Sequence, residues 1–272
     1  MAAPLPQRHL LGVAITAAQL GGTVLRRFFG RLEAAQVEEK GVNDWVSAAD
    51  REAERAIAAY LAVQTPEFGL LAEEGGASGG AGPRWVVDPL DGTANFVRGF
   101  PHFAVSVALV VGREVEVGVI YDPMRDETFS ATRGGGAYRN GRPASVSHRS
   151  SLAGAFLTTG FPYRVARHID TYLQVFREVF FQAGALRRPG AAALDLAHVA
   201  VGIFDGFFEF SLSPWDVAAG SLIVREAGGV VSDLDGGADV LTRGNVLAAT
   251  PAVHAALLEI VARFCREADI TP

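Results

Sequence analysis

The sequence has 272 residues, of which 49% are hydrophobic and 20% are charged. A chain of this size and composition can bury a core, so we expect one large domain or two lobes that share a core. The formal net charge of −6 excludes nucleic acid as the default partner, because binding to a phosphate backbone needs a basic surface. Cys265 is the only cysteine, which excludes a disulfide framework and a thiolate zinc site and fits a cytoplasmic protein.

The first predicted element is an amphipathic helix over residues 10–28, in which apolar residues recur at intervals of three and four. Arg8 and His9, followed by an apolar run, also resemble the start of a signal peptide. The helical pattern continues to Arg26 and Arg27, however, and favours the helix. No apolar segment approaches the length of about 18 residues that a membrane-spanning helix needs.

A loop over "KGVNDWVSAAD", residues 40–50, is predicted to lead into a second helix. Ser47 and Asp50 have the spacing of a capping box at its start, which gives Asp50 a purely structural explanation. The glycine-rich residues 73–83 are expected to form a loop. Because no Gly-Lys-Ser/Thr follows, this loop is not a nucleotide-binding P-loop.

Residues 101–146 read as a run of strands separated by turn residues, which predicts an antiparallel meander. The second half alternates strands with helices. The expected strands lie within residues 154–161, 205–212, 228–234 and 245–250, and the expected helices lie near residues 169–182, 191–202, 215–227 and 251–267. This order predicts a single domain with two approximate lobes, residues 1–150 and 151–272, packed as layers with helices between the sheets.

Two aspartates lie three residues apart in "WVVDPLDGTANF", residues 85–96, directly after an apolar strand. Pro89 is expected to end that strand as a central one, so the chain should turn where Asp88 and Asp91 lie. Two close carboxylates repel each other unless a cation lies between them, and Mg²⁺ suits such an oxygen-rich site. The alternative is a structural turn, because Asp-Pro and Asp-Gly are common turn dipeptides.

Other acidic residues occupy similar positions. Glu73 follows the apolar run "FGLLA" at a probable strand end, and Asp216 begins a predicted helix, where helix capping is the alternative explanation. Gly92 and Thr93 open the next turn or helix, whose free backbone N–H groups could receive a phosphate oxygen.

The segments "WVVDPLDGTANFVRG" and "WDVAAGSLIVREAGG" together resemble the paired signature of the inositol monophosphatase family, in the lithium-sensitive, Mg²⁺-dependent phosphatase superfamily. The resemblance extends over nearly the whole chain through "KGVNDWVSAAD", "LAEEGG", "FPHFAVSVALV" and "RRPGAAALDLAHVAVGIFDGFFEF". It implies an α/β (α+β) fold, the layered αβαβα sandwich shared with fructose-1,6-bisphosphatase. It also implies a homodimer, two or three Mg²⁺ ions per site, and a small phosphorylated polyol or sugar as substrate.

The resemblance also implies a role for each matching residue. The implied side-chain metal ligands are Glu73, Asp88, Asp91 and Asp216, with Leu90 contributing its backbone carbonyl. Glu73, Asp88 and Leu90 would hold one ion, and Asp88, Asp91 and Asp216 a second. The implied catalytic residues are Asp50, Thr93 and Glu73, and the first two would orient the attacking water. The implied substrate contacts are Gly92, Thr93, Ala191, Glu209 and Asp216, and Lys40 and Asp44 would lie on the loop that covers the site.

Three alanines depart from the family pattern. Ala94 replaces a common second Thr, Ala72 replaces a common Gly or Thr, and Ala191 stands where a Thr or Ser often follows the glycine of "RRPG". None of these changes removes a metal ligand. Ala191 lacks a hydroxyl near the expected substrate pocket, so the identity of the alcohol is less certain than the chemistry.

Two segments also have simpler structural explanations. Glu209 could pair with Arg187 or Arg188, and "DLDGGAD", residues 233–239, could be a turn or a calcium loop that lacks the distal Glu.

Three functions follow as hypotheses. The first is hydrolysis of inositol 1-phosphate with Mg²⁺. The second is the activity of a fructose-1,6-bisphosphatase, histidinol-phosphatase, NADP phosphatase or 3′-phosphoadenosine phosphatase of the same superfamily. The third is a regulatory binding protein, because members of the bacterial branch associate with transcription and RNA-processing machinery.

Overall fold

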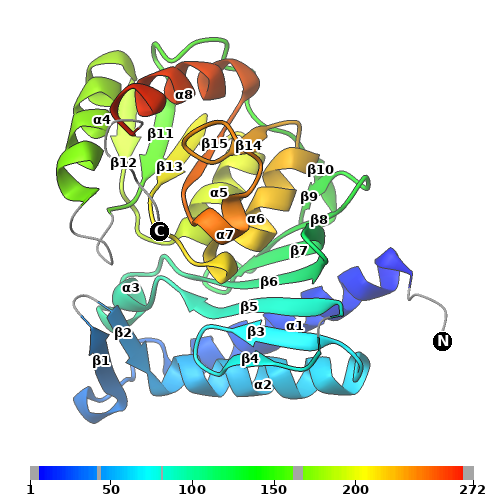
Figure 1. Ribbon diagram of the computed structural model, residues 1–272. Coiled ribbons are helices and arrows are strands. Elements are labelled where there is room, and N and C mark those ends of the chain that lie inside the picture. Colours follow the sequence, from blue (N-terminus) through cyan, green and yellow to red (C-terminus); the bar gives the residue numbers. More distant parts are fainter. Residues whose placement is uncertain (1–5, 42–43, 81, 162–167, 266–272) are drawn as a thin grey trace.

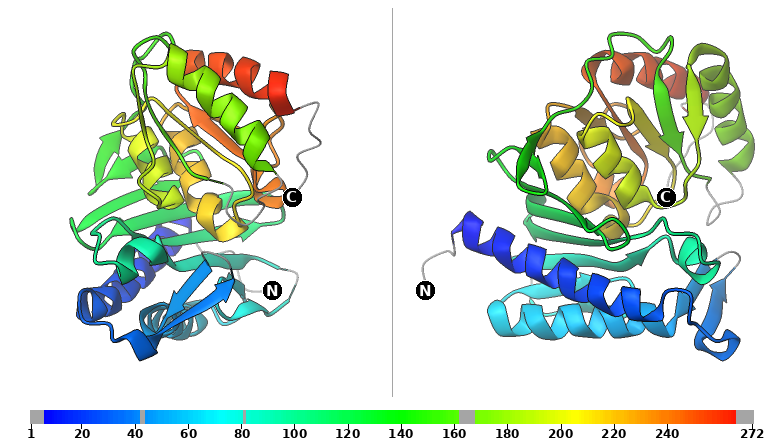
Figure 2. Two further views of the ribbon diagram at one scale, coloured as in Figure 1. Left: turned by 90° about the vertical axis from the view of Figure 1, so that its left-hand side faces the viewer. Right: turned by 180° about the vertical axis from the view of Figure 1, so that it is seen from behind.

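The computed structural model describes residues 6–41, 44–80, 82–161 and 168–265, and it has five layers (Figure 1). A helix pair covers the outer face of each of two sheets, and a third helix pair lies between the sheets (Figure 2). The predicted layered sandwich with helices between sheets is therefore confirmed. Within the described residues, no helix combines the length and hydropathy needed to cross a membrane.

The first outer layer consists of α1 (Gln7–Phe28) and α2 (Ala48–Gln64), which pack against each other and against the larger sheet. The predicted first helix is confirmed, and it begins three residues earlier than its apolar pattern. The predicted capping box at Ser47 is also present, because the Asp50 carboxylate accepts the backbone N–H of Ser47 at 2.9 Å.

The larger sheet has eight strands in the spatial order β10, β9, β8, β7, β6, β5, β3, β4. The bounds are β3 (Gly69–Ala72), β4 (Gly76–Ser78), β5 (Arg84–Asp91), β6 (Ala104–Val111), β7 (Glu114–Asp122), β8 (Glu127–Thr132), β9 (Ala137–Arg139) and β10 (Arg142–Ala144). Strands β6 to β10 form the predicted antiparallel meander, whereas β3 and β5 pair in parallel. The glycine-rich segment was expected to be a loop throughout, but it contains the short edge strand β4.

The expectation that Pro89 ends its strand was wrong. Strand β5 continues through Pro89 to Asp91 and lies between β3 and β6. Its register shifts there, because Asp88 faces Ser106 and Asp91 faces Ala104, so the strand carries one extra residue. A β-bulge of this kind frees a residue from the ladder and accommodates a proline that cannot donate a hydrogen bond.

A second difference concerns the loop expected over residues 40–50. The chain forms a hairpin there from β1 (Val37–Gly41) and β2 (Asp44–Ser47), after the 3₁₀ turn η1 (Ala34–Gln36). Strand β2 leads directly into α2. The hairpin therefore holds its residues at a fixed place beside the start of that helix.

The smaller sheet has five strands in the order β12, β11, β13, β15, β14. Their bounds are β11 (Phe156–Thr159), β12 (Ala185–Arg187), β13 (Gly206–Glu209), β14 (Val230–Ser232) and β15 (Val246–Ala249). The remaining helices are α3 (Thr93–Val97), α4 (Ile169–Gln182), α5 (Ala192–Ala200), α6 (Pro214–Glu226), α7 (Val240–Arg243) and α8 (Pro251–Cys265). The four predicted strands and four predicted helices of this half are confirmed, and β12 was not predicted.

Apolar residues on alternating faces of the strands build three cores. Val87 and Val105 pack toward α1 and α2, whereas Val86 and Ala104 face the central pair, α5 and α6. In the smaller sheet, Phe207 faces α5 and α6, and Phe208 belongs to the core under α4 and α8. This alternation, with a period of two, fixes which face of each strand meets which helix layer.

Candidate active site

A cavity of about 370 Å³ lies where β5, α3 and the start of α6 meet. Eight of the predicted site residues line it, and these are Glu73, Asp88, Leu90, Asp91, Gly92, Thr93, Glu209 and Asp216. They come from segments that lie far apart in the sequence, and the fold brings them together. We therefore take this cavity as the candidate active site.

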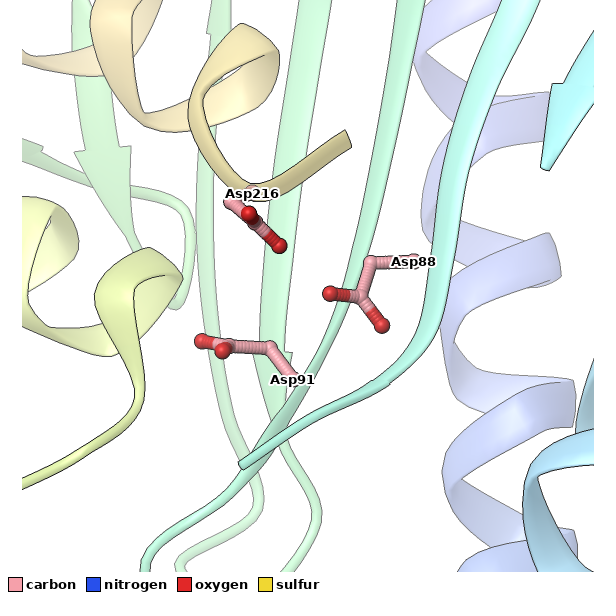
Figure 3. Close-up of side chains that lie close together, drawn as sticks. All are labelled: Asp88, Asp91 and Asp216. Carbon is pink, nitrogen blue, oxygen red and sulfur yellow. The ribbon is translucent and has the colours of Figure 1, made fainter. Parts of the chain in front are cut away.

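Three aspartates converge on one side of this cavity. Ligand oxygens of Asp88, Asp91 and Asp216 lie within 4.8 Å of one another. Figure 3 shows that Asp88 and Asp91 project from the β5 segment toward Asp216, which lies in the first turn of α6. The three side chains form an acidic cluster of the kind that holds a metal ion.

Each aspartate of the cluster also accepts a backbone hydrogen bond. Asp88 accepts the N–H of Leu90 at 2.9 Å, and Asp91 accepts the N–H of Ala193 at 2.7 Å. Asp216 accepts the N–H of Ser213 at 2.7 Å, which is the capping contact given as its alternative explanation. The capping interpretation is correct for Asp216, which forms a capping box with Ser213, whereas the Asp-Pro segment continues as strand β5 and forms no turn. Carboxylate oxygens of all three aspartates still meet in the shared space.

Burial and the repulsion of neighbouring charges disfavour ionisation of Asp88 and Asp91. Burial, followed by the charges of Glu73, Asp91 and Asp216, raises the pKa of Asp88 well above its usual range. Burial and the charge of Asp216 raise the pKa of Asp91 to about 7. Buried carboxylates at such distances stay ionised together when a cation is shared among them. The donor set, made of carboxylate oxygens, fits a hard divalent ion.

Glu73 lies beside the cluster but is not part of it. It occupies the turn between β3 and β4, lines the cavity, and contributes to the raised pKa of Asp88. The backbone carbonyl of Leu90, the predicted fifth ligand, accepts the Thr93 hydroxyl at 2.9 Å. The predicted ligands are thus neighbours, and their metal contacts stay predictions.

Asp50 and Thr93, the predicted water-orienting pair, are in direct contact. The Thr93 hydroxyl lies 2.9 Å from a carboxylate oxygen of Asp50, whose other oxygen accepts the N–H and hydroxyl of Ser47. Burial raises the pKa of Asp50 to about 6, against the lowering effect of these hydrogen bonds. Asp50 does not line the cavity, and it reaches the cavity through Thr93.

Gly92 is required by its surroundings. Its φ angle is +92°, and an added Cβ would lie 3.0 Å from the carbonyl oxygen of His102 and 3.3 Å from Cβ of Ala191. Ala191 is buried behind Gly92, and its neighbour Ala192 lines the cavity instead. The predicted substrate contact of Ala191 stays a prediction.

Glu209, at the end of β13, lines the cavity on the side of the smaller sheet. Gly160 lies against it, because an added Cβ would come within 2.1 Å of the Glu209 carboxyl group. Arg188 lines the same cavity, whereas the guanidinium of Arg187 lies over the ring of Phe156. In the suspected calcium loop, the Asp233 carboxylate accepts the N–H groups of Asp235 and Gly237, as in a turn.

The hairpin contributes a residue that was not among the predicted site residues. Trp45 on β2 lines the cavity, and the guanidinium of Arg98 lies 5.5 Å from the centre of its indole ring. The side chains of Lys40 and Asp44, the predicted covering residues, fall outside the described part of the structure. The sequence does give a signal for Trp45, because each of the three tryptophans lies close to an acidic residue and could form an apolar wall. No spacing pattern pointed to Arg98.

Comparisons with known proteins extend over the same elements. The profile of the inositol monophosphatase family matches residues 7–265. The chain is 46% identical over 258 residues to Nus factor SuhB of Pseudomonas aeruginosa, covering 93% of this chain and 95% of that protein. It is 47% identical over 254 residues to an inositol-1-monophosphatase of Mesorhizobium japonicum, covering 93% and 96%. The crystal structure of extragenic suppressor protein suhB from Bartonella henselae superposes with a TM-score of 0.90 at 43% identity, covering 93% and 98%. The family match runs from the start of α1 to the end of α8 and includes every element that lines the cavity.

Proposed function

Because the chain belongs to the inositol monophosphatase family, we propose that it is a Mg²⁺-dependent phosphate monoester hydrolase that releases myo-inositol from inositol 1-phosphate. The observation that carries this proposal is the convergence of Asp88, Asp91 and Asp216 beside the hydrogen-bonded pair Asp50 and Thr93. The first group suits a metal ion, and the second suits a water molecule. Metal-assisted hydrolysis of a phosphate monoester uses both at one phosphorus atom.

The acidic side chains would hold the ions. Glu73, Asp88 and the carbonyl of Leu90 would hold one ion, and Asp88, Asp91 and Asp216 would hold another, so Asp88 would contribute to both. When bound, Mg²⁺ supplies positive charge that stabilises the leaving oxygen and lowers the pKa of water. This positive charge also explains how an acidic protein holds an anionic substrate.

The other residues act by positioning and proton transfer. The Thr93 hydroxyl accepts a hydrogen bond from the attacking water and donates its own proton toward Asp50, which keeps the water in one orientation. The backbone N–H groups of Gly92 and Thr93 receive phosphate oxygens at the start of α3. Glu209 accepts a hydroxyl of the alcohol on the opposite side of the cavity.

A phosphate-release screen tests the reaction and the substrate together. Inositol 1-phosphate, fructose 1,6-bisphosphate, histidinol phosphate, NADP and 3′-phosphoadenosine 5′-phosphate would be compared with and without Mg²⁺ and Li⁺. We expect Mg²⁺-dependent release that is fastest with inositol 1-phosphate and is inhibited by Li⁺. Faster release from another ester would support the proposed hydrolase activity with a different substrate. No release from any ester would contradict the proposed hydrolase activity.

A second role is favoured by one finding, the name Nus factor carried by a relative that is 46% identical. In this alternative, the chain binds transcription or RNA-processing machinery as a regulatory protein. The variant Asp88→Asn separates the two roles, because it removes a predicted bridging ligand from a buried position. Capture of transcription proteins that survives Asp88→Asn would support a role independent of catalysis.

A further inference from the structure

Glu54 is a second buried carboxylate of α2, one helical turn after Asp50. Its side chain is 9% exposed, and its Oε2 atom accepts the backbone N–H of Glu74 at 2.8 Å. Glu54 does not line the cavity, and the reaction proposed above does not use it. Burying a carboxylate costs free energy unless polar groups compensate it. The presence of Glu54 at a buried position therefore needs an explanation, and its contact with Glu74 suggests one.

The contact lies at the turn that carries Glu73. Ala72 of β3 pairs with Gly76 of β4, and residues 73–75 form the turn between them. A Cβ added to Gly75 would lie 2.7 Å from the Oε1 atom of Glu54. One carboxylate oxygen of Glu54 therefore accepts a hydrogen bond from the turn, and the other lies against Gly75, which has no side chain.

The placement of this turn matters because of what Glu73 is expected to do. The three clustered aspartates are carried by a strand and by a helix, and their oxygens already converge. Of the four predicted side-chain ligands, Glu73 alone lies on a hairpin turn and outside the cluster. Its reach toward a shared ion depends on where the turn is held.

We propose that Glu54 is a positioning residue that fixes the β3–β4 turn so that Glu73 can bind the metal. This inference rests on the proposed Mg²⁺-dependent function. Helix α2 then positions two parts of the site from one face, Thr93 through Asp50 and Glu73 through Glu54. Neither contact places α2 itself in the cavity.

Binding of Mg²⁺ without substrate tests this role by titration calorimetry and by the metal-induced rise in melting temperature. Glu54→Ala is expected to weaken Mg²⁺ binding by about 10-fold or more, the usual effect of losing a group that orients a ligand. Glu54→Gln should stay within about 3-fold of the wild type, because the amide oxygen also accepts the Glu74 N–H. Gly75→Ala should weaken binding from the other side of the contact, by displacing the Glu54 carboxyl group.

The matched control is Glu52→Ala on the same helix, where Glu52 forms an exposed ion pair with Arg27 at 2.7 Å. It should leave Mg²⁺ binding unchanged. In phosphate release, Glu54→Ala should raise the Mg²⁺ concentration for half-maximal activity and recover the wild-type kcat at saturating Mg²⁺. A purely structural role would lower the melting temperature of the metal-free protein and leave the Mg²⁺ affinity of the folded variant unchanged.

Wild-type Mg²⁺ affinity in folded Glu54→Ala would overturn the proposal. If Glu54→Ala does not fold, wild-type affinity in Gly75→Ala would overturn it instead. The two proposals fail separately. If the variants bind Mg²⁺ more weakly but the wild type hydrolyses no ester, the proposed reaction is contradicted and the role of Glu54 is retained. If the wild type is active and the variants bind Mg²⁺ with unchanged affinity, the role of Glu54 is contradicted and the proposed reaction is retained.

Discussion

Asp91 combines a structural contact with a position in the acidic cluster. Its carboxylate accepts the N–H of Ala193 in α5, and one of its oxygens lies within 4.8 Å of ligand oxygens of Asp88 and Asp216. The same side chain therefore ties the end of β5 to the central helix layer and offers an oxygen to a cation. Its pKa, raised to about 7, reflects the cost of placing a charge there.

We predict that Asp91→Asn keeps the fold and loses Mg²⁺-dependent phosphate release by at least about 100-fold, because a metal ligand and its charge are removed. The amide oxygen can still accept the Ala193 N–H, and one repulsive charge is gone. The metal-free variant should therefore melt at or above the wild-type temperature, and the rise in melting temperature with Mg²⁺ should be reduced. Asp170→Asn, at an exposed position on α4, is the control. Full activity of Asp91→Asn would rule out the two-ion scheme.

The acidic residues could be predicted from the sequence, whereas several residues around them could not. Asp88, Asp91 and Asp216 lie in local motifs at the ends of strands or the start of a helix, so their neighbours in the chain identify them. Asn95 lines the cavity and donates to the carbonyl oxygens of His102 and Pro189, which tie α3 to the segment before α5. That contact depends on packing between distant segments, and no local spacing encodes it.

At the scale of elements, the sequence predicted long amphipathic helices and the antiparallel meander, because their apolar periodicity is strong. The hairpin β1–β2 was missed, since "VEEKG" lacks the alternation of a half-buried strand. The path of β5 was predicted wrongly, because a bulge is set by the register with β6 as well as by Pro89. The local propensity of a segment therefore does not determine which strands pair or in which register.

The contact between α6 and β7 positions Asp216 and gives a prediction. A Cβ added to Gly118 on β7 would lie 2.7 Å from the carbonyl oxygen of Ala219, so the helix backbone rests directly on the strand. Ala219 lies about one turn after Asp216 on α6. Gly118→Ala must push the helix away from the sheet, and it is expected to lower the free energy of unfolding by about 1–3 kcal/mol.

Denaturant unfolding and Mg²⁺-dependent phosphate release would measure this effect. The shift in α6 should also displace Asp216, so a higher Mg²⁺ concentration should be needed for half-maximal phosphate release. Gly12→Ala is the control, because Gly12 is exposed on α1 and nothing lies within 4 Å of its added Cβ. That variant should gain about 0.5–1 kcal/mol, as expected for alanine in a helix interior. An unchanged stability of Gly118→Ala would contradict direct backbone packing.

At the scale of the whole molecule, the larger sheet and the central helix layer meet around two buried histidines. His102 precedes β6 and His198 lies on α5, and their ring centroids are 6.2 Å apart. Burial lowers the pKa of each to about 4, with the nearby positive charge of Arg125 adding to the effect. The other charged groups that act on the pair are Asp122, which raises both pKa values, and Arg139, which lowers that of His198.

These two histidines are predicted to reduce the free energy of unfolding in mild acid. Between the unfolded histidine pKa of about 6.5 and the folded value of about 4, the unfolded chain binds more protons. The contribution of the two histidines to the free energy of unfolding should therefore fall as pH decreases from about 6.5 toward 4, by at most roughly 3 kcal/mol for each histidine. The raised pKa values of Asp50, Asp88 and Asp91 act in the opposite direction over this interval. Denaturant unfolding of His198→Phe, a ring that cannot take up a proton, should show a free energy of unfolding that increases relative to the wild type as pH falls over this interval. His9→Phe, at an exposed position on α1, should retain the wild-type slope. An equal pH dependence of the free energy of unfolding in wild type and His198→Phe would contradict this contribution of His198.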